Sequence, residues 1–270
     1  MHLPFFQSLI YQRFKLLLHN NNIYMKDSFI FGIHPILEAL ESGKDIDKLL
    51  VHKGLHNDNI QNIIREAKKR DIYVQFVPVE KLNRVTRKLH QGAIAMMSLV
   101  EYQGIDNILP MIYDKGETPF ILVLDRITDV RNIGAIARTA ECTGVHAILV
   151  PVQNSAKINA EAVKSSAGAI LRVPIARSFN LKEDLKFLKE SGLQIIGVSE
   201  KTDNLYTNND YDLPTAIIMG SEEDGISEEY MKLCDSFAKI PLKGEIGSLN
   251  VSVAAGVVLY EALNQKSKTQ

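Results

Sequence analysis

The second half of the chain constrains the fold most, because short, almost wholly apolar segments alternate with helical patterns from Pro119 onward. Such segments are typical of strands that are buried on both faces, as in a parallel sheet covered by helices. We therefore predict an α/β fold with a parallel sheet, whose ligands lie beyond the carboxyl ends of the strands. The expected strands are 120–125, 146–151, 173–176, 194–199, 216–220 and 237–242, and the expected helices are 132–144, 158–170, 180–192, 227–234 and 248–263.

A smaller α/β module is expected before this region, at residues 29–100. Its pattern is helix, strand, helix, strand, and its second helix, 57–70, has apolar residues at helical spacing. The polar stretch 101–118 contains Gly and Pro and is interpreted as a linker with at most one helical turn. Residues 1–28 are expected to be a poorly ordered extension, with Met25 as an alternative translation start.

Composition excludes several classes of protein. The two cysteines, Cys142 and Cys234, lie far apart and fit no C-x-x-C spacing, which disfavours a disulfide framework or a zinc site and favours a reducing cytoplasm. No apolar run is long enough to span a membrane. The net charge of −1 does not indicate a nucleic-acid binder. Between Ile60 and His90, however, eight basic residues stand against three acidic ones, which by themselves suggest only a solvated helix face.

The spacing Gly220-x-x-x-x-Gly225 resembles half of a phosphate-binding loop. Ile226 follows it where that loop needs Lys, and three acidic residues between the glycines would repel a triphosphate. No G-x-G-x-x-G follows any expected strand, so the usual dinucleotide fingerprint is missing as well. The loop suits an adenosine pressed against backbone. Taken alone, it is explained slightly better by turn geometry.

Two further segments carry polar residues where a strand ends. Asn132 would cap or open a helix, and Arg138 would project from that helix toward the ligand side of the sheet; an ion pair is the simpler explanation of Arg138 alone. Near the C-terminus, Ser248 is expected to cap the last helix, with Asn250 in its first turn.

Together, the segments that start at Asp125, Ile218 and Ile240 closely resemble the three signature motifs of the SpoU (TrmH-like) family. These are RNA ribose 2′-O-methyltransferases of the SPOUT superfamily, and the resemblance runs from Phe120 to Leu263. The region from Phe29, with the sequence FGIHPILEAL, looks like the accessory RNA substrate-binding domain of the family, similar in plan to a small RNA-binding ribosomal protein. The two-domain layout is similar to the guanosine 2′-O-methyltransferases of 23S ribosomal RNA.

One departure from the family pattern concerns the first motif. The usual Asp-Pro-x-Asn reads here as Asp129, Val130, Arg131 and Asn132. Losing the proline loosens the turn before the helix but removes no functional group.

The resemblance implies a deep trefoil knot in the C-terminal parallel-sheet domain, S-adenosylmethionine as cofactor, no metal, an RNA substrate and a homodimer with active sites at its interface. The implied domains are an RNA-binding domain at 29–100 and a methyltransferase domain at 119–270. The implied cofactor-binding residues are Met219, Gly220, Ile240, Leu242, Ser248 and Leu249, and the implied catalytic residues are Arg138, Asn132, Glu222 and Asn250.

Three alternatives remain open. One is an enzyme of the same class with a transfer-RNA substrate, against which the accessory domain argues mildly. A second is a catalytically silent RNA-binding protein on the same scaffold, which the intact Arg138, Glu222 and Asn250 disfavour. The third, an unrelated α/β enzyme that binds a nucleotide, is disfavoured by the missing phosphate-loop lysine and dinucleotide fingerprint.

Overall fold

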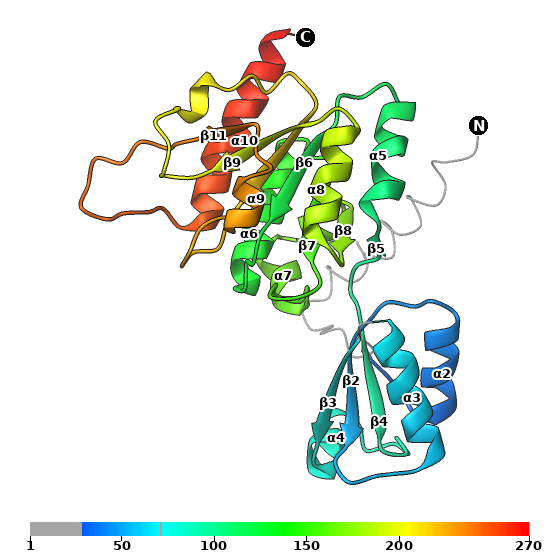
Figure 1. The fold of residues 1–270 in the computed structure, drawn as a ribbon. Coiled ribbons are helices and arrows are strands. Elements are labelled where there is room, and N and C mark those ends of the chain that lie inside the picture. Colours follow the sequence, from blue (N-terminus) through cyan, green and yellow to red (C-terminus); the bar gives the residue numbers. More distant parts are fainter. Residues whose placement is uncertain (1–28, 71, 270) are drawn as a thin grey trace. The chain divides into compact units, whose positions relative to one another are not determined.

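The chain divides into two compact units, with the boundary in the sequence between Met97 and Ser98 (Figure 1). A computed structural model describes residues 29–70 and 72–269. The extension predicted for residues 1–28 lies outside the described residues.

The N-terminal unit is a four-stranded mixed sheet with three helices. Its strand order is β1-β4-β2-β3; β2 and β3 are parallel, and β4 runs antiparallel to both β1 and β2. Side chains from α2 and α3 form its main core with β2 and β4. The elements are β1 (Phe29–Phe31), α2 (Ile33–Glu41), β2 (Ile46–His52), α3 (Asp58–Lys69), β3 (Tyr73–Val77), α4 (Val79–Val85) and β4 (Ala93–Met97).

The C-terminal unit is built on a seven-stranded sheet in the order β11-β9-β10-β6-β7-β8-β5. Every paired strand in it is parallel to its neighbour, as the apolar strands predicted. The strand order reverses beside β6, which lies between β10 and β7, and such a reversal is where open α/β sheets form ligand crevices. The strands are β5 (Tyr102–Gln103), β6 (Phe120–Leu124), β7 (Ala147–Pro151), β8 (Ile175–Ser178), β9 (Gln194–Val198), β10 (Thr215–Met219) and β11 (Ser236–Ala238).

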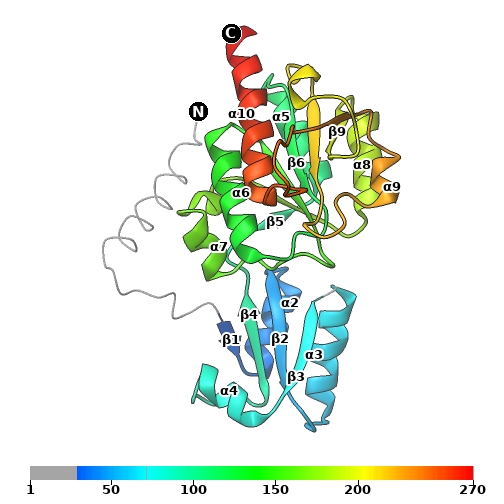
Figure 2. The ribbon, with the colours of Figure 1, turned by 90° about the vertical axis from the view of Figure 1, so that its left-hand side faces the viewer.

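Helices cover both faces of this sheet (Figure 2). Alternate residues of β6 face opposite cores: Phe120, Leu122 and Leu124 contact the side that α6, α7 and α10 cover, and Ile121 and Val123 contact the side of α5 and α8. The α-helices are α5 (Ile105–Asp114), α6 (Val130–Cys142), α7 (Ala160–Ser165), α8 (Leu181–Glu190), α9 (Glu228–Met231) and α10 (Val251–Thr269), and the 3-10 helices are η1 (Ala169–Leu171) and η2 (Tyr206–Asn208).

The stretch 101–118, interpreted above as a linker, belongs to the C-terminal unit. It forms β5, which pairs with β8, and the ten-residue helix α5, which has Pro110 inside it. Ile105, Ile108, Leu109 and Ile112 are buried on one face of α5. The helical spacing of these four residues predicts the helix, whereas the Gly and Pro content of the stretch suggests a linker. The helix forms because burial of four large apolar side chains outweighs the cost of one proline inside it.

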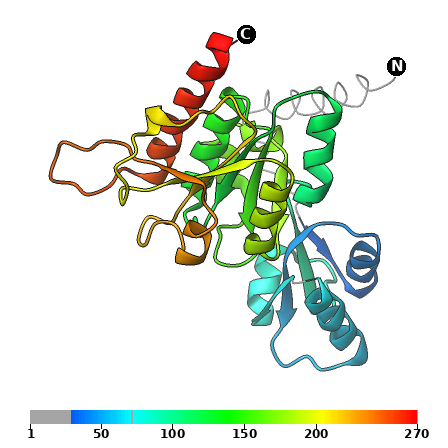
Figure 3. The same cartoon turned by 45° about the horizontal axis from the view of Figure 1, so that its top comes forward.

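The segment before the last helix also differs from expectation. The predicted strand 237–242 is limited to β11, and residues 241–250 form an exposed loop that projects from the unit (Figure 3). The helix α10 begins at Val251, so Asn250 precedes it, and the expected cap at Ser248 is wrong. The side-chain oxygen of Asn250 accepts a hydrogen bond from the amide of Ser252 at 3.0 Å and so satisfies a free donor of the first turn.

Candidate active site

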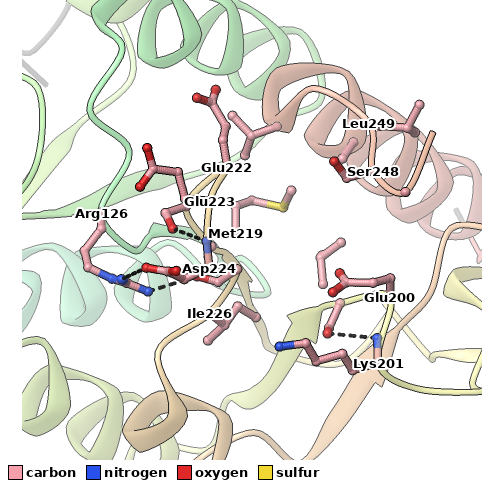
Figure 4. A pocket seen from close by; sticks show the side chains of 18 of the residues that line it. Arg126, Glu200, Lys201, Met219, Glu222, Glu223, Asp224, Ile226, Ser248 and Leu249 are labelled. Carbon is pink, nitrogen blue, oxygen red and sulfur yellow. Dashed lines mark hydrogen bonds and ion pairs between the residues drawn. The ribbon is translucent and has the colours of Figure 1, made fainter.

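A pocket of about 1110 Å³ opens where the carboxyl ends of β9, β10 and β11 meet (Figure 4). Its walls are the residues that follow these strands, together with the start of α10. Arg126, just beyond the end of β6, completes the lining. The pocket therefore lies at the edge of the sheet where the parallel-strand pattern placed ligands.

The loop after β10 forms one wall of the pocket, and its conformation explains why it contains two glycines. Ser221 and Gly225 exchange two backbone hydrogen bonds of 3.0 Å, which folds the loop into a tight turn with Glu222, Glu223 and Asp224 at its tip. A Cβ atom on Gly220 would lie 2.1 Å from the carbonyl carbon of Gly225, so no other residue fits there. The turn-geometry explanation of these glycines is thus correct, and the same turn lines the pocket.

Asp125 and Arg126 hold this loop against the end of β6. Asp125 is 1% exposed and accepts hydrogen bonds from both the amide and the hydroxyl of Ser227, each at 2.7 Å. Arg126 donates to Asp224 at 3.1 Å and to the carbonyl oxygen of Gly225 at 3.0 Å. Its φ of 58° is unusual for a residue other than glycine, so these contacts hold a strained backbone. Sequence reasoning did not single out this pair.

Three of the four predicted catalytic residues meet in one hydrogen-bonded chain. The Asn132 amide donates to the Glu222 carboxylate, and the Asn250 amide donates to the Asn132 side-chain oxygen at 3.2 Å. Each of the three predicted motifs contributes one member, although 118 residues separate Asn132 from Asn250. These hydrogen bonds fix the orientation of each asparagine side chain, because an amide that both donates and accepts can satisfy both bonds in one orientation only.

All six residues predicted to bind the cofactor line the pocket. Met219, Gly220, Ile240, Leu242, Ser248 and Leu249 surround it together with Glu222 and Asn250. Leu242 and Leu249 are more than a third exposed, so they offer an uncovered apolar surface. Such a surface beside closely approaching backbone suits a flat apolar ring with polar edges, as in adenine.

Arg138 does not join this group. It is exposed on α6 and does not line the pocket of its own chain, contrary to the expectation that it points to the ligand side of the sheet. Arg138 follows Asn132 by six residues, so in α6 its side chain is rotated by roughly 240° about the helix axis and displaced by about 9 Å along it. Within the described part of the chain it has no ion-pair partner either, so the simpler ion-pair explanation is not supported.

The charge in the pocket is mainly negative. Glu200 and Glu228 add to the three acids of the β10 loop, and Arg126 and Lys201 are the basic side chains of the lining. Such a lining attracts a cationic ligand and repels a free phosphate. Glu200 and Lys201 were not predicted, although their place directly after β9, a strand next to β10, was a usable signal.

Neither a metal site nor a membrane span is present in the described part of the chain. In residues 29–70 and 72–269, no group of three or more His, Cys, Asp or Glu side chains is placed to hold a metal ion. Nor does any helix in that range combine the length and the apolar character of a membrane span.

Two family models match the chain, one on each unit. The SpoU rRNA Methylase family matches residues 119–260, and the family described as RNA 2′-O ribose methyltransferase substrate binding matches residues 29–103. The first match alone covers more than half of the chain. The chain belongs to the SpoU rRNA methylase family. This confirms the family predicted from the three segments, and with it the prediction of an RNA methyltransferase; the knot remains a prediction.

Relatives match this chain in sequence over nearly its whole length. A Staphylococcus aureus protein named as a TrmH family tRNA/rRNA methyltransferase is 36% identical over 90% of this chain and 98% of its own. A protein of the same description from Bacillus subtilis is 34% identical over 88% of this chain and 96% of its own. Among solved structures, the SpoU methyltransferase AviRb of Streptomyces viridochromogenes, in complex with the cofactor AdoMet, has a TM-score of 0.57 at 25% identity, covering 96% of this chain and 98% of its own.

Proposed function

We propose that this protein transfers a methyl group from S-adenosylmethionine to a ribose 2′-hydroxyl in RNA, with a guanosine of 23S ribosomal RNA as its target. The observation that carries the proposal is the hydrogen-bonded chain of Asn132, Glu222 and Asn250 at a pocket that all six expected cofactor residues line. An unrelated nucleotide-binding enzyme would not require one polar residue from each of these three segments.

The lining of the pocket suits S-adenosylmethionine in its apolar surface and its charge. Apolar side chains such as Met219, Ile240 and Leu249 would contact the adenine, and backbone near Gly220 would recognise its polar edge. When bound, S-adenosylmethionine supplies a methyl group on a positively charged sulfur, which is already a good leaving group. The acidic lining around Glu222 favours that positive charge.

The remaining work for the protein is alignment and the handling of one proton. Asn132, Glu222 and Asn250 would orient the ribose, because their own orientation is fixed by hydrogen bonds to one another. Arg138 would supply a fixed positive charge beside the developing 2′-alkoxide and the neighbouring phosphate. A guanidinium essentially never loses its proton in proteins, so the role of general base is not assigned to it.

Arg138 can take this role in a homodimer, by reaching the pocket of the partner subunit. Its side chain is exposed and has no ion-pair partner among the described residues, which suits that position. The neighbouring helix α10 packs on α6 and exposes Val253 and Tyr260, which are 52% and 54% exposed and lie on one face of the helix. An exposed apolar face on α10 and an exposed arginine on α6, the helix that packs on it, suit a subunit interface with a polar rim.

The decisive experiment is to map 2′-O-methylation in ribosomal and transfer RNA from cells with and without the gene. Loss of one guanosine modification in 23S ribosomal RNA, restored by the purified protein and S-adenosylmethionine, is expected. Loss of a transfer-RNA modification would favour the first alternative above. Unchanged methylation in both RNAs, with intact cofactor binding, would favour the catalytically silent protein.

A further inference from the structure

The basic residues between Ile60 and His90, which form one run in the sequence, lie at two opposite ends of the N-terminal unit. The helix α3 runs back along β2, so its last turn, with Lys68, Lys69 and Arg70, lies beside the start of β2 and β3. The following α4 and the loop after it lie at the other end, because Ala93 pairs with Val51 near the end of β2.

The N-terminal unit is strongly basic at the end where β2 finishes. Five exposed cations gather there, and we call them the basic end: Lys53, Lys81, Arg84, Arg87 and Lys88. Two hydrogen bonds bring their segments together. The amide of Lys53 donates to Val77, just before α4, and the amide of His52 donates to Gly92, at the end of the loop that carries Arg87 and Lys88, both at 2.8 Å.

Few carboxylates compensate this charge. Glu80 on α4 and Asp58 at the start of α3 are the acids on the segments that form the basic end. Within the described residues, none of the five cations makes an ion pair; Lys88 lies 5.9 Å from the centroid of the Phe31 ring.

The opposite end has six cations, Lys44, Lys48, Arg65, Lys68, Lys69 and Arg70, and four carboxylates, Glu41, Asp45, Asp47 and Glu66. Glu66 accepts a hydrogen bond from Lys69 at 2.8 Å and lies 3.8 Å from Arg65. The Lys69 ammonium, through this hydrogen bond, holds the pKa of Glu66 below its ordinary value. Asp45 and Asp47 add negative charge at the start of β2. Within the described residues, six cations face four carboxylates here and five face two at the basic end, so the net positive charge is lower here and part of it is already paired with Glu66.

The loop of the basic end is also held in one conformation. His90 bonds to Asn83 at 3.1 Å and accepts from the amide of Gly92 at 3.0 Å, and the side chain of Gln91 accepts from the amide of Ile33 at 3.0 Å. Gly92 has a φ of 85°, and a Cβ there would lie 2.3 Å from the side chain of Leu55. A loop fixed in this way loses little conformational entropy on binding.

We infer that the basic end is the surface through which the N-terminal unit binds the phosphate backbone of substrate RNA, and that the cations at the end of α3 are not. The inference rests on the proposed function, because a polyanion is identified as RNA by the reaction proposed for the other unit. The planar guanidinium groups of Arg84 and Arg87 bind phosphate through paired hydrogen bonds and stack on unpaired bases. Neutralised phosphates release counterions, so this contact is salt-dependent.

The test compares two triple variants of the full-length protein that remove the same residue types. One is Lys81→Gln, Arg84→Gln and Arg87→Gln; the control is Arg65→Gln, Lys68→Gln and Arg70→Gln, which keeps the Lys69–Glu66 pair. Both lower the net charge equally. Binding to a 23S ribosomal RNA transcript and to a transfer RNA transcript is measured from about 50 to about 200 mM salt.

The basic-end variant is expected to bind RNA roughly twenty-fold more weakly at about 50 mM salt, with the gap closing as salt rises, because three phosphate contacts change the salt slope by about 2. The control should stay close to wild type. Arg84→Lys with Arg87→Lys should fall between the control and the basic-end variant, because it keeps both charges but loses the planar guanidinium groups. S-adenosylmethionine affinity and the melting temperature verify folding of both units.

Equal losses in the two triple variants would overturn the inference, since general charge would then explain the binding. Wild-type RNA affinity in the basic-end variant would overturn it too, and would leave that surface to another polyanion such as an acidic protein. Neither result would affect the proposed function. Failure of the wild-type protein to bind either RNA would overturn both.

Discussion

The pocket of the C-terminal unit and the basic end of the N-terminal unit are built in opposite ways. The pocket is acidic, and its hydrogen bonds join residues as far apart as Asn132 and Asn250. The basic end is formed by neighbouring turns around α4, and its cations remain unpaired within the described residues. Chemistry requires several groups in one fixed arrangement, whereas affinity for a polyanion requires only charge at the surface.

The largest expected effect comes from cutting the chain at two different places. A fragment of residues 98–270 should fold and bind S-adenosylmethionine like the whole chain, whereas a fragment of residues 119–270 should not fold. The second fragment lacks α5, whose four buried side chains each contribute about 1.5 to 3 kcal/mol. Circular dichroism and calorimetry make the comparison. A stable shorter fragment would show that α5 is dispensable, and a folded longer fragment without cofactor affinity would break the assignment of the pocket.

Next in size is the effect of Arg138 on the rate. Arg138→Ala is expected to lower single-turnover methyl transfer by about 10² to 10³, the usual cost of losing one electrostatic donor. Arg138→Lys keeps the charge but not the planar fork, so it should retain part of the rate. Cofactor affinity should hardly change, because the residues expected to bind the cofactor all come from the second and third motifs and not from α6. A fully active Arg138→Ala dimer, verified by sedimentation, would exclude the catalytic role.

A smaller effect tests whether the long-range contacts of the pocket hold its shape. Arg126→Gly accepts the positive φ but loses the bonds to Asp224 and Gly225, so S-adenosylmethionine should bind about tenfold more weakly. Asp224→Asn should have a similar effect, and the two together should be less than additive. Arg131→Ala, which removes an exposed ion pair to Asp129, is the matched control. Additive losses would show that Arg126 and Asp224 act separately.

The smallest effect concerns the start of the sheet, at the far end of β6 from the pocket. His146 accepts from the amide of Phe120 at 3.0 Å and lies 3.3 Å from Glu117. Burial lowers the pKa of His146, and Glu117 only partly opposes this. The unfolded chain therefore binds more protons, and stability should fall as pH drops below about 6.5, by a melting temperature change of about 2 °C. His146→Asn should weaken this dependence of the melting temperature on pH. An unchanged dependence in that variant would show that other titratable groups cause it.

The sequence predicts the pocket better than it predicts the exposed positions of Arg138 and of the basic residues between Ile60 and His90. Motif resemblance predicted six cofactor-binding residues, all of which line the pocket, and periodicity predicted the parallel sheet. Arg138 does not line the pocket of its own chain, because where a side chain points depends on which face of α6 the core covers. The basic run was read as one helix face, because only the reversal of the chain after α3 shows that it divides between two ends.

The missed contact of Asp125 and Arg126 has a similar cause. Nothing local distinguishes these two residues, since their partners Asp224 and Ser227 are about a hundred positions away. The linker was misjudged for the opposite reason. Its apolar spacing was visible, but Pro110 was given more weight than the burial that the sheet provides.

The order of the segments that build the pocket has a consequence for synthesis of the protein on the ribosome. Asn250 and the loop before it come just ahead of α10, the last helix of the chain, and a chain folds from its N-terminus as it is made. The N-terminal unit, with its basic end, is therefore complete long before the pocket can close around a cofactor. With the RNA contact inferred for the basic end, a nascent chain passes through a stage in which it can hold RNA but cannot yet modify it.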